Sequence, residues 1–397
     1  MTAQNPLETH PPTFAAYVPH FLTISMTFIH RQLLGVSGSF RPIVLTSELE
    51  HQDVFRFPHP IYCAPRRRAE SLLLKIQRRL SGRYTSIAPS QRASWASAIR
   101  EMDARLIHAH FGPSGIEILP VAEKTHTPLV VTFHGYDASM LLRNSRYRRD
   151  LERLFRSAYV ITVSRRMARQ LEQYGARNDR MWHHYIGIPV DEFVGAPRRP
   201  IDEKITAGET VELLQVSNFV PKKGHEWTVR AFAGLLEHVP RCRLTLAGDG
   251  PLRPETEALA RELELGEKIR FLGKVSKAQV IPLMRDADVF VHHSVTDDRG
   301  DQEGIPTVLM EAMATGLPVV STDHSGISEL IDHGDNGLLV SERDVPGYVM
   351  ALREVMESGH TLGACAIAKI HRDFNMEKQN ERLVEIYEQV LGNDARV

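Results

Sequence analysis

The sequence feature that most constrains the fold is an alternation, repeated along the whole chain, of short β-branched runs with longer stretches of helical periodicity. Strands that alternate with helices are typical of parallel sheets joined by helical crossover connections. The strand candidates of the first half are 15–21, 42–47, 105–111, 128–135 and 159–164. Those of the second half are 211–217, 243–250, 268–273, 287–294 and 317–322. The sequence therefore predicts an α/β protein with two doubly wound parallel sheets.

The chain length also favours two domains, because 397 residues are too many for one ordinary hydrophobic core. Segment 195–210, GAPRRPIDEKITAGET, is rich in proline, glycine and charge, and we expect it to be a linker. The predicted domains are 1–194 and 211–375, followed by a C-terminal helix within 376–397. One face of that helix carries apolar side chains that we expect the protein's own core to cover: Leu383, Ile386, Tyr387, Val390 and Leu391.

Charge is distributed unevenly between the two halves. Residues 1–200 hold 27 Lys and Arg against 16 Asp and Glu, and the remainder is acidic because the whole chain carries a net charge of −1. A basic half indicates an anionic partner such as a phosphate, an anionic lipid or a nucleic acid, although a solvated Arg-rich surface gives the same pattern. Nucleic acid is not expected, because the basic stretches lack interleaved aromatic residues.

Two Arg-rich stretches, 66–83 and 143–156, contribute to this basic charge. The first also has apolar residues on one face, a pattern typical of helices on a membrane surface and equally of amphipathic core helices: Leu72, Leu73, Ile76 and Leu80. An anionic membrane surface is therefore one candidate partner of the first half.

The cellular compartment is indicated by what the sequence lacks. Its three cysteines, Cys63, Cys242 and Cys365, are far apart and suggest neither a disulfide framework nor a metal site. No run approaches the roughly 18 apolar residues of a membrane span, and the first residues show no export signal. We expect a cytoplasmic protein that can act at the inner face of the cell membrane.

The stretch with most chemical information is 297–331. The strand candidate 287–294 leads into a polar loop with Glu303, Gly304, Ile305 and Pro306, and a helical pattern follows. In an α/β sheet this arrangement directs free backbone N–H groups into the crevice at the carboxyl ends of the strands, where a phosphate binds well. Glu311 lies eight residues after Glu303 inside the helix, so the two acids can contact different parts of one long ligand.

Histidines mark the carboxyl ends of two strand candidates in the first half. His134 ends the strand 128–135 and is followed by a glycine, which suits either a ligand contact or a structural role. His108 and His110 share one face of the strand 105–111, a spacing that can bind a metal. Because no third ligand has a compelling position, we expect no metal site.

The pattern E-G-I-P-x4-E-A-M-A-x-G-x-P-V-V at 303–320 resembles the E-x7-E region of the retaining glycosyltransferases of family 4. Further similar segments follow in the order of that family: TISMTFIHRQL (23–33), IHAHFG (107–112), VTFHGYD (131–137), ITVSRRMARQL (161–171), GIPVDEF (187–193), LAGDGPLR (246–253) and NGLLV (336–340). The resemblance covers the chain from about residue 14, and within the family it is nearest to bacterial exopolysaccharide and colanic-acid-type members. It implies the GT-B fold, in which two Rossmann-like domains face a cleft and the C-terminal helix returns to the N-terminal domain.

The resemblance also implies roles for individual residues. Glu303 matches the acid that hydrogen-bonds the donor sugar, and Glu311 matches the acid that holds the ribose hydroxyls. His134 matches a histidine that contacts the sugar from the N-terminal, acceptor-binding domain. In the nucleotide-sugar-binding C-terminal domain, Lys223 matches the lysine that binds the diphosphate, and the loop Gly304, Ile305 and Pro306 belongs to the donor site.

One position departs from the family pattern. Where the family has an arginine that helps Lys223 to hold the diphosphate, this sequence has Asn218. An asparagine donates hydrogen bonds but carries no charge, so the leaving diphosphate is stabilised less at that point. Lys222 or an arginine from the basic half are candidates to compensate. The G-D-G at 248–250 lacks the rest of a dinucleotide fingerprint, and we expect it to form a turn.

These observations predict a retaining, metal-independent glycosyltransferase without a cofactor, whose substrate is a nucleoside-diphosphate sugar. It would move a hexose-type sugar to a hydroxyl of a saccharide acceptor, carried on a polyprenyl diphosphate. Two alternatives remain open: an enzyme of the same fold that acts on a small soluble acceptor, and a catalytically silent sugar-nucleotide-binding protein. A nicotinamide-dependent oxidoreductase is disfavoured by the short G-D-G.

Overall fold

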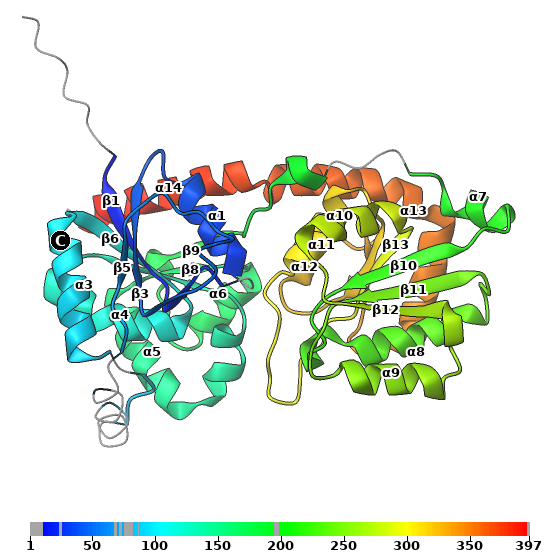
Figure 1. The fold of residues 1–397 in the computed structure, drawn as a ribbon, viewed down its shortest axis with the longest axis horizontal. Coiled ribbons are helices and arrows are strands. Elements are labelled where there is room, and N and C mark those ends of the chain that lie inside the picture. Colours follow the sequence, from blue (N-terminus) through cyan, green and yellow to red (C-terminus); the bar gives the residue numbers. More distant parts are fainter. Residues whose placement is uncertain are drawn as a thin grey trace, which may run out of the picture. The chain divides into compact units, whose positions relative to one another are not determined.

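The computed structural model describes residues 11–23, 26–66, 70, 74, 82–85, 87–193 and 198–394. The chain divides into two compact units. Unit 1 comprises the chain up to Thr162, residues 168–184 and the chain from Gln379, and unit 2 comprises residues 163–167 and 185–378. Each unit contains one large parallel sheet with helices on both faces (Figure 1), as the alternation in the sequence predicts.

The sheet of unit 1 has seven strands, and their order in the sheet reverses between β1 and β6. From one edge to the other they are β5 (Ile61–Cys63), β3 (Arg41–Thr46), β1 (Thr13–Tyr17), β6 (Ala104–His110), β7 (Leu129–Phe133), β8 (Tyr159–Thr162) and β9 (Met181–His183). A separate two-stranded pair joins β2 (His20–Phe21) to β4 (Glu48–Leu49). The central strands are apolar and buried along most of their length because helices cover both faces.

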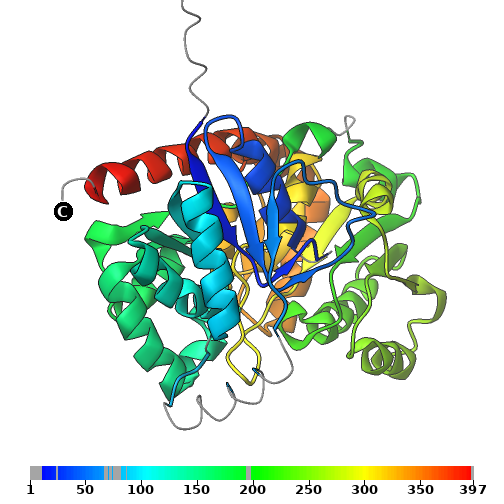
Figure 2. The same cartoon turned by 60° about the vertical axis from the view of Figure 1, so that its left-hand side comes forward.

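The helices of unit 1 lie on opposite faces of its sheet (Figures 1 and 2). They are α1 (Thr27–Gly35), α3 (Pro89–Glu101), α4 (Gly112–Thr125), α5 (Ser145–Ser157), α6 (Arg165–Glu172), whose first residues belong to unit 2, and the C-terminal α14 (Met376–Asp394). On one face, α3 packs Trp95 against Tyr17 of β1. Helix α5 begins at Asn144, whose side chain accepts hydrogen bonds from the first backbone N–H groups of the helix.

The C-terminal helix α14 packs on the other face of this sheet together with α1. Its apolar stripe enters the same core as Phe14 of β1, and the ring centroids of Phe14 and Tyr387 lie 5.2 Å apart. The expected return of the last helix to the N-terminal sheet is confirmed. The reason is that four stripe residues are fully buried there and the fifth packs against them: Leu383, Ile386, Tyr387 and Val390, with Leu391.

The sheet of unit 2 has six strands and reverses its order between β10 and β13. From edge to edge they are β12 (Ile269–Gly273), β11 (Cys242–Ala247), β10 (Val211–Val216), β13 (Val289–His292), β14 (Val319–Thr322) and β15 (Leu338–Val340). Its helices are α7 (Ile201–Thr206), α8 (His225–Leu236), α9 (Arg253–Glu262), α10 (Lys277–Asp286), α11 (Thr307–Ala314), α12 (Ile327–Leu330) and α13 (Val345–Asp373).

Two apolar cores lie on the two faces of this sheet. On one face α8, α9 and the first half of α13 pack against alternate residues of β10 and β11, such as Leu213 and Leu244. On the other face α10, α11, α12 and the second half of α13 cover Leu214 and Phe290. The two strand orders correspond to the doubly wound arrangement, in which ligands bind outside the carboxyl ends of the strands where the order reverses.

The structure differs from the sequence-based expectations in three respects. Residues 201–206 of the expected linker form the helix α7, and Ile201 belongs to the core of unit 2. The main part of unit 2 begins at Tyr185, before the expected linker. The edge strands β5, β9 and β15 were not among the strand candidates. Of the Arg-rich stretch 66–83, most residues lie outside the described part of the chain, including the apolar Leu72, Leu73, Ile76 and Leu80.

Candidate active site

The carboxyl ends of β10 and β13 in unit 2 bring together most of the residues that the sequence singles out. After β10 the chain forms a single 3₁₀ turn, Pro221–Lys223, before α8. After β13 it forms the polar loop that ends in α11. The two segments are joined by the backbone, because Val295 N–H donates a hydrogen bond of 3.0 Å to the carbonyl of Lys222.

Gly224 permits this close approach. Its φ is +58°, and a Cβ atom at this position would lie 1.8 Å from the carbonyl oxygen of His293. Only glycine meets both conditions without displacing the backbone. Lys223 is therefore fixed beside the loop after β13 by the residue that follows it.

Two lysine–carboxylate pairs connect the same segments through their side chains. Lys222 Nζ lies 3.0 Å from Asp301 Oδ2, and Lys223 Nζ lies 3.0 Å from Glu303 Oε1. Burial alone would raise the pKa of Glu303, but the charges of Lys223 and Lys222 outweigh it, so this pKa lies below its ordinary value. Burial alone would lower the pKa of Lys222, and the charges of Glu303 and Asp301 reverse that effect. Glu303 and Lys222 are thus both charged near neutral pH.

The loop Gly304, Ile305 and Pro306 leads directly into α11. Ile305 anchors it in the core of unit 2. Pro306 occupies the N-cap position of α11 and supplies no side-chain cap, and its carbonyl accepts from Leu309 N–H at 3.1 Å. The N–H groups of Thr307 and Val308 have no partner among the described residues and are available for an anion. Glu311 is partly buried inside this helix.

Asn218 follows β10 and is exposed, and its neighbour Phe219 contacts the G-D-G segment. Phe219 N–H donates to the carbonyl of Asp249, and a Cβ on Gly248 would lie 1.9 Å from the carbonyl of Ser217. The expected turn begins only at the last residue of G-D-G and spans Gly250–Arg253, where Arg253 N–H donates to the Gly250 carbonyl at 3.1 Å. Gly248 instead lets two chain segments run in contact. No described contact joins the Asn218 side chain to Lys223.

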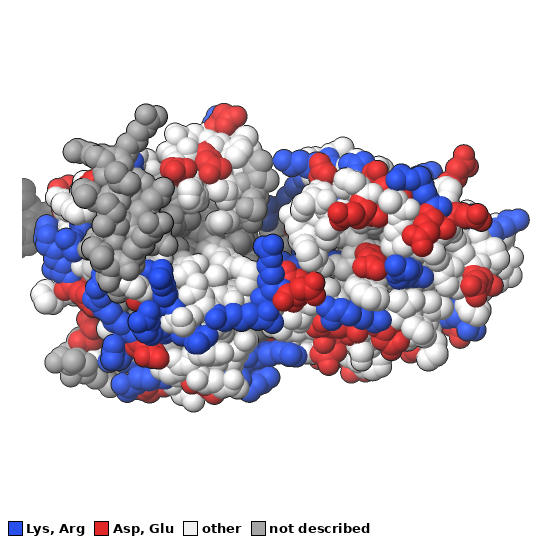
Figure 3. Space-filling model, turned by 90° about the horizontal axis from the view of Figure 1, so that it is seen from below, with Lys and Arg blue, Asp and Glu red and all other residues white. Residues whose placement is uncertain are grey.

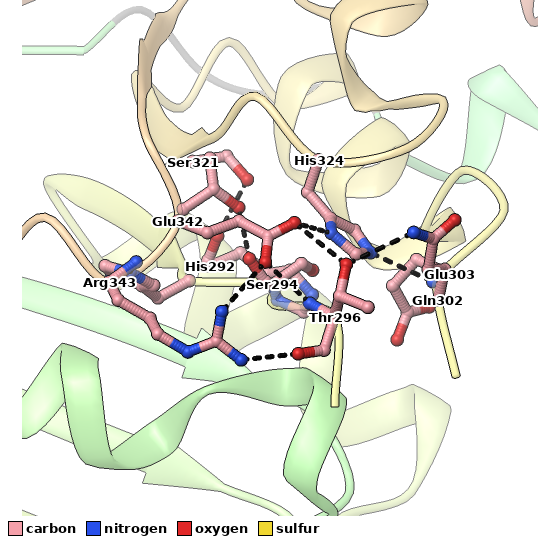
Figure 4. Close-up of polar contacts among 11 residues, drawn as sticks. His292, Ser294, Thr296, Gln302, Glu303, Ser321, His324, Glu342 and Arg343 are labelled. Carbon is pink, nitrogen blue, oxygen red and sulfur yellow. Dashed lines mark hydrogen bonds and ion pairs between the residues drawn. The ribbon is translucent and has the colours of Figure 1, made fainter. Parts of the chain in front are cut away.

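A second polar network, shown in Figure 4, supports the Glu303 loop and was not anticipated from the sequence. His324, after β14, and Glu342, after β15, share a hydrogen bond of 2.6 Å between Nδ1 and Oε1. His324 Nε2 lies 3.1 Å from the backbone nitrogen of Glu303. The sequence pattern does not indicate a role for His324 or Glu342, because each is an isolated polar residue in a loop and its partners follow other strands.

In unit 1 the structure places His134 at the end of β7 beside His110 at the end of β6. Their nearest ring nitrogens, His134 Nε2 and His110 Nδ1, are 3.2 Å apart. Burial lowers the pKa of both histidines, that of His110 to about 3, so both are neutral at pH 7. The rings of Phe28 and Phe111 lie 5.0 and 4.5 Å from that of His134. The Nδ1 atom of His134 is buried and, among the described residues, has no hydrogen-bond partner.

The histidine pair His108 and His110 does not form a joint ligand set in unit 1. His108 Nδ1 lies 2.6 Å from the hydroxyl of Tyr387, and its Nε2 lies 2.7 Å from the hydroxyl of Thr132. Both ring nitrogens of His108 are thus engaged with side chains of α14 and β7. This residue connects the C-terminal helix to the sheet.

Two doubly wound sheets, with cationic side chains and a helix N-terminus at the switch point of the second, define a GT-B glycosyltransferase architecture. Solved structures share the fold. Anabaena HepE (Alr3699) in complex with UDP has a TM-score of 0.77 at 20% identity and covers 95% of this chain and 100% of its own. Sucrose-phosphate synthase from Thermosynechococcus elongatus has a TM-score of 0.75 at 18% identity, covering 96% and 100%.

The chain belongs to glycosyltransferase family 4. The family model described as Glycosyltransferase Family 4 matches residues 51–192, and that described as Glycosyl transferases group 1 matches residues 198–371. WcaL of Salmonella typhimurium LT2, named for colanic acid biosynthesis, is 31% identical over 71% of this chain and 70% of its own. The amylovoran biosynthesis glycosyltransferase AmsK of Erwinia amylovora is 28% identical over 66% and 64%. None of the described helices is long and apolar enough to cross a membrane.

Proposed function

We propose that this protein is a retaining, metal-independent glycosyltransferase that moves a hexose-type sugar from a nucleoside diphosphate to a hydroxyl of a saccharide acceptor. The observation that carries the proposal is the pair of lysines, Lys222 and Lys223, held beside Glu303 and the free N-terminus of α11. Cations and backbone N–H groups at a switch point suit a diphosphate, and a buried carboxylate beside them suits sugar hydroxyls.

In this reaction the bond between the anomeric carbon and the diphosphate breaks, and negative charge accumulates on the leaving phosphate oxygen. Lys223, Lys222 and the first N–H groups of α11 stabilise that charge with groups that are already in position, which is the most effective form of electrostatic catalysis. The two lysines supply the positive charge that a metal ion would otherwise provide. No cofactor takes part.

Retention follows if the acceptor hydroxyl attacks the anomeric carbon from the side that the diphosphate leaves. The new bond joins the acceptor oxygen to that carbon, and the departing phosphate oxygen takes the hydroxyl proton. Glu303 binds the donor sugar, Glu311 binds the ribose hydroxyls, and His134 contacts the sugar. Asn218 contributes a neutral hydrogen bond where the family pattern has an arginine.

For the acceptor we propose a saccharide on a polyprenyl diphosphate in exopolysaccharide assembly, in the cytoplasm at an anionic membrane. Support comes from the names of WcaL and AmsK and from the basic first half of the chain. On the side of unit 1 where α5 lies, basic side chains gather in groups (Figure 3). Helix α5 itself carries three exposed arginines: Arg146, Arg149 and Arg156.

A thermal-shift screen against UDP-, GDP- and ADP-sugars tests the donor first. A ligand that binds only the folded state raises the unfolding free energy by about 2.7 kcal/mol at 100 times its Kd, so one nucleotide series should raise the Tm. Transfer from the selected donor, with EDTA present, should then give a product with the anomeric configuration of the donor. An inverted product, or activity lost in EDTA, contradicts the mechanism. Donor binding without turnover on any acceptor favours a catalytically silent sugar-nucleotide-binding protein. Turnover on small soluble acceptors alone favours an enzyme of the same fold with a small acceptor.

A further inference from the structure

The backbone of Glu303 is held by a histidine from a neighbouring strand. His324 is fully buried, and its Nε2 lies 3.1 Å from the backbone nitrogen of Glu303. A backbone N–H can only donate, so Nε2 must be the acceptor and must carry no proton. The neutral ring then has its proton on Nδ1. This assignment follows from the hydrogen-bond partners.

Glu342 selects that tautomer. Its Oε1 lies 2.6 Å from His324 Nδ1 and therefore accepts the Nδ1 proton. Burial alone would raise the pKa of Glu342, but hydrogen bonds from His324 and Thr296 outweigh it, so the carboxyl group is ionised at neutral pH. An ionised carboxylate is a pure acceptor, and a ring that donates to it through Nδ1 presents a lone pair at Nε2.

The same carboxylate also holds the start of the loop that carries Glu303. Thr296 donates to Glu342 through its backbone N–H (2.8 Å) and its hydroxyl (3.1 Å). Within the loop, Gln302 Nε2 donates to the Thr296 hydroxyl oxygen at 3.2 Å. Figure 4 shows the contacts of Thr296 and His324 converging on the Glu342 carboxylate. Residues 296 and 303 are thereby tied to the ends of β14 and β15.

We propose that His324 and Glu342 are positioning residues that act as a pair to place the Glu303 carboxylate for sugar transfer. This inference rests on the proposed function, because it assigns Glu303 to the donor sugar. Neither His324 nor Glu342 needs to touch the substrate. The pair acts through the Glu303 backbone, and a displacement of about 1 Å at a reacting group costs on the order of 100-fold in rate.

The activity test compares two substitutions of His324. In His324→Gln the side-chain oxygen can accept from Glu303 and the amide can donate to Glu342, whereas His324→Leu does neither. We expect the leucine variant to lower kcat about 10- to 100-fold with little change in KM for the donor. The glutamine variant should recover most of that loss. His333→Leu is the matched control, because the exposed His333 also accepts a backbone N–H, from Leu339, away from Glu303.

A second measurement does not need activity. Nitrogen-15 NMR of the wild-type chain should show His324 with a protonated Nδ1 and an unprotonated Nε2, and Glu342→Leu should weaken this preference. Equal kcat in the leucine and glutamine variants, or an Nε2-protonated His324 in the wild type, would overturn the proposal. If no sugar nucleotide is turned over but the tautomer is as expected, the proposed function fails and the pair remains a device that orders the loop.

Discussion

Lys223 Nζ lies 3.0 Å from Glu303 Oε1, with 16% and 10% of the two side chains exposed. We assign the Lys223 ammonium group to the diphosphate and the Glu303 carboxylate to the donor sugar. In the ligand-free chain these two groups are paired with each other. A donor that binds here must share Lys223 with Glu303 or replace this contact. The pair keeps the buried Glu303 carboxylate ionised and orients both side chains until the donor arrives.

Glu303→Gln should lower kcat about 100-fold or more, because a contact to the reacting sugar is lost. This substitution should not weaken nucleoside-diphosphate binding, because it removes a negative charge that repels the phosphates and leaves Lys223 in place. Glu311→Gln should do the reverse and mainly raise the donor KM. Steady-state kinetics with calorimetric titration of the nucleoside diphosphate separates the two effects. An equal loss of nucleotide affinity in both variants would refute the division of roles.

Lys223→Ala should weaken diphosphate binding about 10- to 100-fold, the usual range for losing a charged hydrogen bond. Lys222→Ala is the matched comparison, because each lysine is paired with a carboxylate at 3.0 Å. It should have a smaller effect, since the family resemblance assigns the diphosphate to Lys223. Asn218→Arg should tighten binding by restoring a bidentate cation. Calorimetric titration measures all three. If neither Lys223→Ala nor Asn218→Arg changes the affinity, another cation binds the diphosphate.

Gly224→Ala should destabilise unit 2 and impair donor binding together. The added methyl group would meet the carbonyl oxygen of His293 at 1.8 Å, and the φ of +58° disfavours any L side chain. We expect a loss of more than about 1 kcal/mol, since such substitutions exceed the ordinary glycine effect. Gly234→Ala is a control inside α8, the helix that follows Gly224, where the nearest atom is a Val349 methyl at 3.1 Å. Comparable melting temperatures for the two variants would contradict the close approach.

His184 predicts a pH dependence of stability. It is buried, its Nε2 donates to the carbonyl of Gln379 at 2.7 Å, and burial lowers its pKa to about 4 from 6.5. Between these values the unfolded chain binds a proton that the folded chain does not, so the free energy of unfolding falls as pH falls, by about 1.4 kcal/mol per pH unit. His184→Gln removes the contribution of this residue, whereas those of other buried histidines such as His110 and His134 remain. The Tm of the wild type minus that of the variant should therefore decrease from pH 7 to pH 5. A Tm difference that does not change with pH would contradict the lowered pKa of His184.

Replacement of Arg146, Arg149 and Arg156 by alanine should weaken binding to vesicles that contain anionic lipid by about 1 kcal/mol per charge, or roughly 100-fold in total. These residues of α5 are exposed, whereas the helix packs into its unit through Tyr147 and its apolar neighbours. Wild-type binding should fall steeply by about 0.5 M salt, where the Debye length is only a few ångströms.

The matched control for the vesicle experiment replaces three exposed basic residues of unit 2, Arg261, Arg270 and Lys274, with alanine. It removes the same charge and should leave binding nearly unchanged. Co-sedimentation measures all three proteins. A wild type that fails to bind vesicles even at low salt would exclude the membrane proposal and favour a small soluble acceptor.

The sequence by itself determined the class of fold, because burial on both faces of a parallel strand and on one face of a helix leaves a local periodic pattern. Each strand candidate overlaps an observed strand, and the stripe of α14 is buried as expected. The edge strands β5, β9 and β15 were missed because each has three residues and a single neighbouring strand, so the pattern is too short to read.

The candidate site divides in the same way. The stretch around Glu303 and Glu311 is a continuous motif, so the sequence could single it out. What only the tertiary structure decided is what surrounds it: Lys222 against Asp301, and His324 between Glu303 and Glu342. Those partners follow different strands, so finding them requires the order of the strands in the sheet. The residues next to each partner in the sequence carry no information about that order. The pairing exists because the parallel sheet brings the carboxyl ends of β10, β13, β14 and β15 to one edge.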